Sequence, residues 1–226
     1  RMICTYRNRS ASVRSQRYRL DATGELFDIA RDPGQYSNIA AEKPEIAAKM
    51  QAVADRFIEE VRGVEDDDRP YTVGYPEFPT TYLPARDGIP HGGVKRSSGA
   101  PNCSYFTNWT STEDQITWDI EVANAGDYQA IVYYTCPDKD TGAQIEASFL
   151  NARLAGKVSE GFDPPLVGAA EDRVKRSGES FVKDWRPLDL GTMRLEKGRG
   201  LFTLRATEVP GAQVMDVRCV VLKLLG

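Results

Sequence analysis

The first twenty residues hold the side chains best suited to binding an anion. They include six guanidinium groups and no carboxylate: Arg1, Arg7, Arg9, Arg14, Arg17 and Arg19. Guanidinium groups pair bidentately with sulfate, phosphate or carboxylate groups, so an anion-facing surface is one interpretation. The other interpretation is that these arginines cover the solvated face of a pair of strands.

Aromatic residues in the second half of the chain are candidates for a different chemistry. An aromatic face is apolar and polarisable, so it can stack on a sugar ring. The candidates for this contact are Tyr105, Phe106, Trp109, Tyr133 and Trp185. The same side chains could equally fill a core. Trp118 alternates with aliphatic residues in "ITWDIEV" and is predicted to be buried.

The cysteines and the histidine limit the metal and redox chemistry available. The spacing of Cys4, Cys103, Cys136 and Cys219 excludes the usual zinc-ribbon and thioredoxin-like patterns. A disulfide among the last three and buried free thiols are both compatible with that spacing. With His91 as the single histidine, a multi-histidine metal site is excluded.

The composition excludes two further classes of function. The net charge of −4 argues against a general nucleic-acid binder, and no apolar run approaches the roughly 20 residues that span a bilayer. The 226 residues suffice for one large domain or two small ones. Because the chain does not begin with Met, we expect its natural start to lie upstream.

Residues 1–63 are predicted to form a small antiparallel sheet followed by a helix. Strand patterns cover residues 2–7, 12–21 and 25–30, and Asp32-Pro33-Gly34 then ends the sheet. The helix is expected to begin at Pro44 and to stop at Gly63. Its apolar stripe consists of Ile46, Met50, Val53, Phe57 and Val61.

The rest of the chain divides into a connector and a β-rich domain. Six of the 13 prolines lie within residues 64–101, so we expect a surface connector there, with Glu65–Asp68 as a solvated acidic run. Residues 102–226 are predicted to be a β-sandwich or jelly roll. The expected fold is therefore mainly β, with an α+β N-terminal part.

The order "SVRSQRYRLD…GELFDIARDPGQYSNIAAEKPEIA" resembles the C-terminal subdomain of the type I, formylglycine-dependent sulfatases. That family has a strand ending in a phrase like "ELYDL", a D-P-x-E/Q turn, an Asn-Leu or Asn-Ile-Ala step and a final helix. The equivalents here are Glu25–Ile29, Asp32–Gln35 and Asn38–Ala40, followed by the helix. The resemblance covers residues 1–63.

This resemblance implies the C-terminal portion of a periplasmic or secreted sulfatase that acts on sulfated carbohydrate. Its partner would be the N-terminal catalytic domain of the same chain, which binds calcium in this family. None of the four cysteines here fits the motif C-x-P/A-x-R from which formylglycine is made, and no position matches the family's metal or catalytic residues. We therefore expect no catalytic residue and no cofactor in this stretch, and no hydrolysis of sulfate esters by it alone.

The same resemblance places this subdomain beside the catalytic pocket. It implies that some of Arg7, Arg9, Arg14 and Arg17 face a sulfated glycan. The alternative is that these arginines cover the sheet or form ion pairs with the absent domain.

Residues 102–226 resemble a β-sandwich appended to some bacterial sulfatases and the galactose-binding-like, carbohydrate-binding sandwiches. The phrases that carry this are "AGDYQAIVYY" and "LEKGRGLFTLRA". The resemblance implies sugar binding, with Trp109, Tyr133 and Trp185 as contacts. Three hypotheses follow: part of a sulfatase, a non-catalytic glycan-binding or adhesion module, and a purely structural pair of domains.

Overall fold

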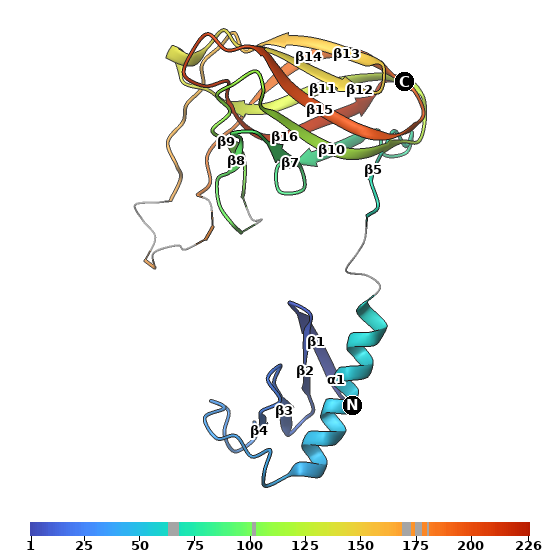
Figure 1. Ribbon diagram of the computed structural model, residues 1–226, viewed down its shortest axis with the longest axis vertical. Helices are drawn as coiled ribbons and strands as arrows, with labels where there is room; N and C mark the ends of the chain where they lie inside the picture. Colours follow the sequence, from blue (N-terminus) through green and yellow to red (C-terminus); the bar gives the residue numbers. More distant parts are fainter. Residues whose placement is uncertain (63–67, 101–102, 169–172, 175–177, 180) are drawn as a thin grey trace. The chain divides into compact units, whose positions relative to one another are not determined.

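The computed structural model describes residues 1–62, 68–100, 103–168, 173–174, 178–179 and 181–226 (Figure 1). It divides the chain into two compact units, Arg1–Arg69 and Pro70–Gly226, each with its own hydrophobic cluster. We call these unit 1 and unit 2. Strands predominate in the described residues, so the predicted mainly-β fold class is confirmed. The predicted helix stop at Gly63 and most of the acidic run lie outside the described residues.

The sheet of unit 1 has four antiparallel strands, in the order β1 (Ile3–Arg7), β2 (Ser10–Arg14), β3 (Tyr18–Leu20) and β4 (Leu26–Asp28). The single strand predicted over residues 12–21 is two strands here. The Ser15 amide donates to the Tyr18 carbonyl over 2.8 Å, and the Tyr18 amide donates to the Ser15 hydroxyl oxygen over 2.9 Å. These two bonds close a tight turn, so the segment forms a hairpin.

The segment between β4 and the helix is held by two polar side chains. Asn38 Oδ1 accepts from the Leu26 amide over 3.1 Å and from the Ala40 amide over 2.9 Å. Asp32 Oδ2 accepts from the Ser37 amide over 2.9 Å. Backbone donors in a chain reversal need such acceptors when no strand partner is present. Asp32 and Asn38 therefore connect the sheet to the helix.

Helix α1 (Pro44–Arg62) begins at the predicted proline and packs on one face of this sheet. Met50 and Ala54 are buried, and Ile46, Val53 and Phe57 are partly buried against the same cluster. Val61 does not belong to it, so the apolar stripe ends one turn earlier than predicted. The sheet contributes Ala11, Val13, Leu20 and Leu26 to this core.

Unit 2 is a sandwich of two sheets (Figure 1). One has the order β13-β12-β15-β10-β5, with β7 also paired to β10; the other has the order β14-β11-β16-β9-β8, with β6 also paired to β16. The strands are β5 (Tyr71–Val73), β6 (Thr80–Pro84), β7 (Ile89–His91), β8 (Lys95–Arg96), β9 (Phe106–Thr107), β10 (Gln115–Val122), β11 (Gly126–Thr135), β12 (Gln144–Phe149), β13 (Ala152–Lys157), β14 (Arg186–Leu195), β15 (Gly198–Glu208) and β16 (Asp216–Leu224), with a 3-10 turn at Asp138–Asp140.

Residues 70–100 belong to this sandwich, and the prediction of a connector over 64–101 is wrong for them. Four strands, β5 to β8, come from this stretch, and Leu83 in β6 is fully buried. Proline lacks an amide donor but is tolerated in an edge strand or at a strand end. Pro84 stands at the end of β6, and its carbonyl accepts the indole N–H of Trp118 over 2.9 Å.

The core of unit 2 lies between the two sheets. Trp118 in β10 is 1% exposed, as predicted, and its ring meets those of Phe106 and Phe202 at centroid distances of 6.0 and 6.4 Å. Tyr128 and Tyr134 in β11 are also buried. Both keep their hydroxyls bonded, to the carbonyls of Asn124 and Glu160. A buried hydroxyl needs such a partner, so these tyrosines are core residues rather than ligand contacts.

Because the two cores are separate, a cavity in one should spare the other. Met50→Ala is expected to destabilise unit 1 by about 2–5 kcal/mol, since it removes a buried side chain from a small cluster. Hydrogen exchange followed by mass spectrometry should report faster exchange in β1 to β4 and α1 only. The exposed neighbour Lys49→Ala serves as the control. Equal loss of protection in both units would contradict the division.

Candidate binding surfaces

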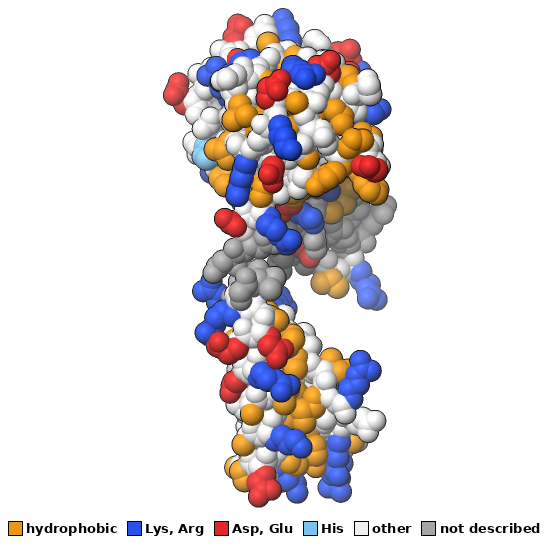
Figure 2. Space-filling view, turned by 90° about the vertical axis from the view of Figure 1, so that its right-hand side faces the viewer, with side chains coloured by type: hydrophobic (Ala, Val, Ile, Leu, Met, Phe, Trp, Pro, Cys, Tyr) orange, Lys and Arg blue, Asp and Glu red, His pale blue; other side chains and the backbone are white. Residues whose placement is uncertain are grey.

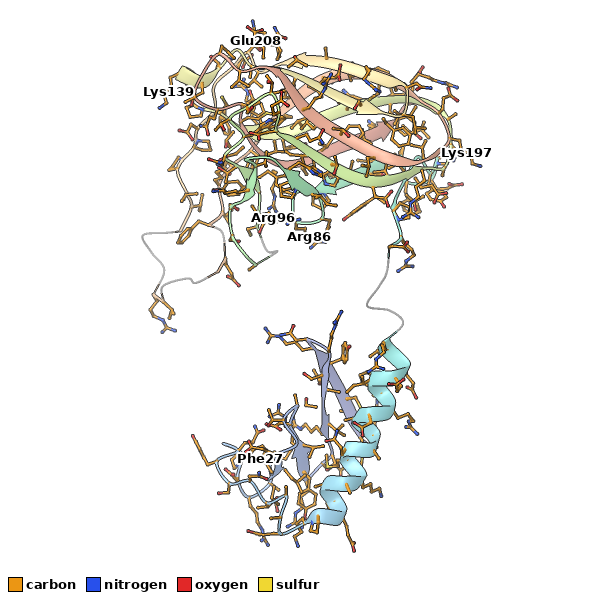
Figure 3. All side chains as sticks on the ribbon, viewed as in Figure 1. Phe27, Arg86, Arg96, Lys139, Lys197 and Glu208 are labelled. Atoms are coloured by element: carbon orange, nitrogen blue, oxygen red, sulfur yellow. The ribbon has the colours of Figure 1, made fainter. Side chains whose placement is uncertain are left out.

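The face of the unit 1 sheet that lies away from helix α1 is basic. The strand register places Ile3, Arg14, Arg19 and Phe27 in one row across β1 to β4. Phe27, labelled in Figure 3, lies outside the cluster that packs on the helix. We call this surface the basic face. Figure 2 shows several Lys and Arg side chains standing out from unit 1.

A hollow of about 380 Å³ lies on the basic face. Two of its lining residues carry guanidinium groups, three carry hydroxyls and one carries an amide, and no carboxylate lines it. The lining consists of Thr5, Arg7, Asn8, Ser10, Ser12, Arg19 and Ala22. Guanidinium and hydroxyl donors that converge in this way suit an anion.

The four predicted arginines are placed differently from one another. Arg7 lines the hollow, and Arg14 lies on the same face without lining it. Arg9 stands in the hairpin turn between β1 and β2, with a φ of 62°. Arg17 is ion-paired, with Nη2 and Nε 2.8 and 3.0 Å from Asp28 Oδ2. Two of the four predicted arginines therefore share the basic face.

Arg19, one of the six arginines near the start of the chain, was not among the four predicted to face a ligand. It pairs directly with Arg14 across β2 and β3, so both side chains point to the same face. The prediction of one strand over residues 12–21 hid this relation, because an uninterrupted strand would place these two side chains far apart. The signal that could have found it is the polar "SQR" triplet at residues 15–17, between Val13 and Tyr18, which is typical of a turn.

The pair Arg17–Asp28 is structural. The hydrogen bond from Arg17 is the largest effect on Asp28, and it lowers the pKa of that carboxyl against the opposing effect of burial. The Arg17 guanidinium also lies 5.1 Å from the centre of the Tyr18 ring. Because the guanidinium is committed to Asp28 and to this ring, Arg17 is a poor candidate for ligand binding.

Trp109 and Phe106 are core residues, and the prediction that Trp109 contacts sugar is wrong. Both are 1% exposed and belong to the main cluster of unit 2. The Trp109 carbonyl accepts from the Val214 amide over 2.8 Å, which holds its backbone between the sheets. A ring so deeply buried cannot stack on a ligand.

Trp185 and Tyr105 are partly exposed, but they pack on each other and on a buried lysine. Their ring centroids are 5.1 Å apart, and Lys183 Nζ lies 4.4 Å from the Tyr105 ring and 4.8 Å from the Trp185 ring. Lys183 is 7% exposed and donates to Thr135 Oγ1 over 2.7 Å and to Asp216 Oδ2 over 2.6 Å. One face of each ring is therefore occupied by an internal cation.

Tyr133 lies on the outward face of the β14–β11–β16–β6 sheet. We call this surface the aromatic face. Its residues alternate along each strand with the residues that point into the core. Tyr133 is half-buried, and Val221 beside it is 5% exposed although it is not part of the main core. The register gives two rows: Pro187, Tyr133, Cys219 and Pro84, then Asp189, Ile131, Val221 and Tyr82.

Three exposed aromatic residues in or before β6 were missed. Tyr82 is 60% exposed, Phe78 is 79% exposed and Tyr75 is 51% exposed. Tyr75 and Phe78 form an isolated bridge, with the Phe78 amide donating to the Tyr75 carbonyl over 3.0 Å. They were overlooked because residues 64–101 were interpreted as a connector. The aromatic residues of "YPEFPTTY" were the available signal.

The outward face of the opposite sheet has a different character. Arg199 in β15 pairs with Asp119 in β10 over 2.7 Å, and Arg205 pairs with Glu146 in β12 over 2.9 Å. Leu201 is an exposed hydrophobic residue between these charges, at 53%. Figure 2 shows acidic, basic and apolar side chains interspersed on the side of unit 2 that it draws. Among the described residues of unit 2, the exposed aromatic side chains therefore lie in β6 or just before it.

A second group of arginines, at β7 and β8, is also structural. Figure 3 labels Arg86 and Arg96 there, and Arg96 donates to the Arg86 and Gly88 carbonyls. The Arg96 guanidinium lies 5.8 Å from the centre of the Phe106 ring. Arg86 pairs with Asp87 over 3.0 Å. These contacts connect the 84–96 segment to the sandwich.

The described residues contain no cluster suited to a metal and no disulfide. All four cysteines are free thiols, and burial raises the pKa of both Cys136 and Cys219 to about 11. Within the described ranges, no three His, Cys, Asp or Glu side chains lie close enough to bind an ion, and His91 Nε2 is 2.8 Å from Thr117 Oγ1. Nor does the described chain hold a helix with the length and apolarity needed to cross a membrane.

Neither a protein-family model nor a curated protein sequence matches this chain. Solved structures with a similar fold include a GH26-CBM35 β-(1,4)-mannanase from Podospora anserina, at 13% identity and a TM-score of 0.45, covering 65% of this chain and 28% of that one. A family 35 carbohydrate-binding module from Clostridium thermocellum has 14% identity and a TM-score of 0.42, covering 63% of this chain and 96% of that one. The Cry4Aa toxin from Bacillus thuringiensis has 14% identity and a TM-score of 0.48, covering 65% of this chain and 24% of that one. Similarities this distant carry no argument about function.

The Arg17–Asp28 pair is expected to make unit 1 sensitive to acid. Because the folded-state pKa of Asp28 is lowered, the pair stabilises the fold above the ordinary carboxyl pKa of about 3.9, and this is lost as pH falls through the folded value. Unfolding of unit 1 should be followed between about pH 2 and pH 7. Asp28→Asn is expected to weaken the acid dependence, whereas the exposed Glu42→Gln should not. The same acid dependence in wild type and Asp28→Asn would refute this role.

Proposed function

We propose that unit 2 is a non-catalytic glycan-binding β-sandwich and that the aromatic face is its binding surface. The observation that supports this most directly is the exposure of Tyr82, which pairs with Val221 in the neighbouring strand and shares one sheet face with Ile131 and Tyr133. A contiguous apolar surface, unlike a single scattered residue, marks an interaction site, and Ile131 and Tyr133 on the same face are partly exposed as well.

The geometry of this face fits a chain of sugar rings. Tyr82 and Tyr133 lie two strands apart, and adjacent strands are spaced by about 4.8 Å. They also differ by two residues along the strands, so their Cα positions are about 12 Å apart, which suits a ligand of extended shape with two or more rings. Phe78, two residues before the first residue of β6, is a further exposed aromatic residue next to this strand.

Polar side chains border the aromatic face. Gln129 Nε2 donates to Asp189 Oδ2 over 2.7 Å, and Lys223 and Thr80 form the next pair across β16 and β6. Amide, carboxylate, ammonium and hydroxyl groups together offer both donors and acceptors. A sugar needs both, since its ring has an apolar side and its hydroxyls need hydrogen-bond partners.

Tyr82→Ala and Phe78→Ala are each expected to weaken glycan binding about tenfold, because each removes one stacking ring. The full chain is first screened on an array of neutral and sulfated oligosaccharides, and the best ligand is then titrated calorimetrically. Leu201→Ala is the matched control, because it removes an exposed hydrophobic residue from the opposite sheet. We expect that variant to bind normally.

Two results would overturn the proposal. Absence of retention on every glycan would favour a structural module. If the chain instead dimerises in solution and Tyr82→Ala yields monomers without any glycan binding, the aromatic face is a protein interface. Analytical ultracentrifugation of both proteins separates these outcomes.

Unit 1 supports a second candidate function, that of the C-terminal subdomain of a sulfatase acting on sulfated carbohydrate. What favours it is the agreement between the resemblance and the local contacts. Asp32 and Asn38 of the family-like phrase make the hydrogen bonds that connect β4 to α1. The catalytic domain, with its calcium site, would then lie upstream of Arg1, and the protein would be periplasmic or secreted.

The second candidate is tested by the coding sequence that precedes Arg1. We expect it to encode a large α/β domain with a C-x-P/A-x-R or S-x-P/A-x-R motif near its start, and the full-length protein to hydrolyse an aryl sulfate. The chain of 226 residues, assayed alone, serves as the control and should be inactive. An upstream sequence of another kind would refute this candidate without affecting the role of unit 2.

A further inference from the structure

The hollow on the basic face combines charge with unused hydrogen-bonding capacity. The Arg7 guanidinium makes no ion pair within the described residues, and the hydroxyls of Thr5 and Ser12 make no hydrogen bond there. Thr5 and Ser12 face each other across β1 and β2, and Arg7 pairs with Ser10 in the same ladder. The hollow therefore has a floor of hydroxyl groups beneath a guanidinium group.

Arg19 supplies the second charge. Its Nη1 donates to Gln35 Oε1, which holds the side chain in place while leaving other N–H groups of the guanidinium available. Gln35 belongs to the D-P-x-Q turn and has a φ of 56°, so the backbone of this turn presents its side chain toward β3. The turn after β4 thus helps to position one wall of the hollow.

The carboxylate of Asp21, in the turn after β3, is already committed. Asp21 accepts from the Thr23 and Glu25 amides, each over 2.9 Å, and from the Thr23 hydroxyl. Burial opposes ionisation of Asp21, but these hydrogen bonds and the positive charge of Arg19 outweigh it and lower the pKa of the carboxyl. Asp21 therefore stays ionised within its own turn and does not line the hollow.

The basic face brings like charges close together, and the Asp21 carboxylate near Arg19 offsets only part of this charge. Arg14 and Arg19 lie directly opposite each other on neighbouring strands, and like charges in such positions destabilise a sheet. Arg7 adds a third charge to the same face. A bound anion between Arg7 and Arg19 would offset this repulsion, since charge-assisted hydrogen bonds are stronger than neutral ones.

We propose that this hollow binds the oxyanion group of a sulfate or phosphate monoester. A tetrahedral oxyanion accepts hydrogen bonds in several directions, which matches two guanidinium groups on the walls and hydroxyls on the floor. A carboxylate accepts only in one plane and would use fewer of these donors. The volume of about 380 Å³ lies within the range of small-ligand sites and leaves room for the group that carries the ester.

The experiment titrates the full chain with glucose 6-sulfate and with glucose 6-phosphate at low ionic strength, using calorimetry and NMR. Glucose and acetate are the neutral and carboxylate comparisons. Arg7→Gln and Arg19→Gln are each expected to weaken ester binding about tenfold, and Ser12→Ala about threefold. Arg14→Gln is the matched control, because it removes the same charge from the same face outside the hollow, and less than a threefold change is expected.

Arg19→Lys separates the role of geometry from that of charge. It keeps the positive charge but loses the planar fork, so binding is expected to remain weaker than in the wild type. Binding should also fall as salt is raised, because an exposed ionic contact is screened. Circular dichroism of each variant confirms that the four-stranded sheet is intact.

Several results would overturn the inference. Equal loss from Arg14→Gln and Arg7→Gln would mean a diffuse basic surface. Equal binding of glucose or acetate would mean that the hollow does not select a tetrahedral oxyanion. A clear preference for one of the two esters shows whether the hollow suits a sulfate or a phosphate group. Tyr82→Ala is expected to leave ester binding unchanged. A failure of the oxyanion site in unit 1 can therefore be distinguished from a failure of the glycan-binding role of unit 2.

Discussion

Neighbouring side chains along a β-strand point to opposite faces of the sheet, and both units of this protein depend on that constraint. In β2, the residues that pack under helix α1 alternate with Ser10, Ser12 and Arg14 on the basic face. In β11, the core residues alternate with Ile131 and Tyr133 on the aromatic face. Each candidate binding surface is therefore the outward half of a pattern whose inward half builds a core. A shift of one residue in register would exchange the two halves.

Ion pairing separates the charges that hold the fold together from those that are open to a ligand. Arg17 is held by Asp28, Arg199 by Asp119, and Lys183 by Asp216 beneath two aromatic rings. Buried or partly buried charges need such partners, because desolvation is costly. Arg7 has no comparable partner in the described residues, although it stands only ten residues before Arg17. Arg7 is a candidate for ligand binding because it lacks an ion-pair partner there, and not because of its residue type alone.

The sequence predicted local structure well where a single segment carried the whole signal. Helix α1 begins at Pro44, and Met50, Val53 and Phe57 pack as the helical period requires. The alternation around Trp118 correctly placed that ring in the core. Prediction failed at Ser15, where two short hydrogen bonds divide one apparent strand into two. Because that turn sets which way Arg19 points, a local error concealed a candidate site residue.

What the sequence determined by itself was the order of elements, the apolar stripe of the helix and the alternation within each strand, because these follow from contacts between near neighbours. Only the tertiary structure decided that Trp109 is buried while Tyr82 is exposed. Both residues lie near prolines or turns, where no period is visible. Their environment depends on pairings between distant segments, such as β6 with β16. Long-range pairing is selected by how the two sheets close over a common core, and no short stretch of sequence contains that information.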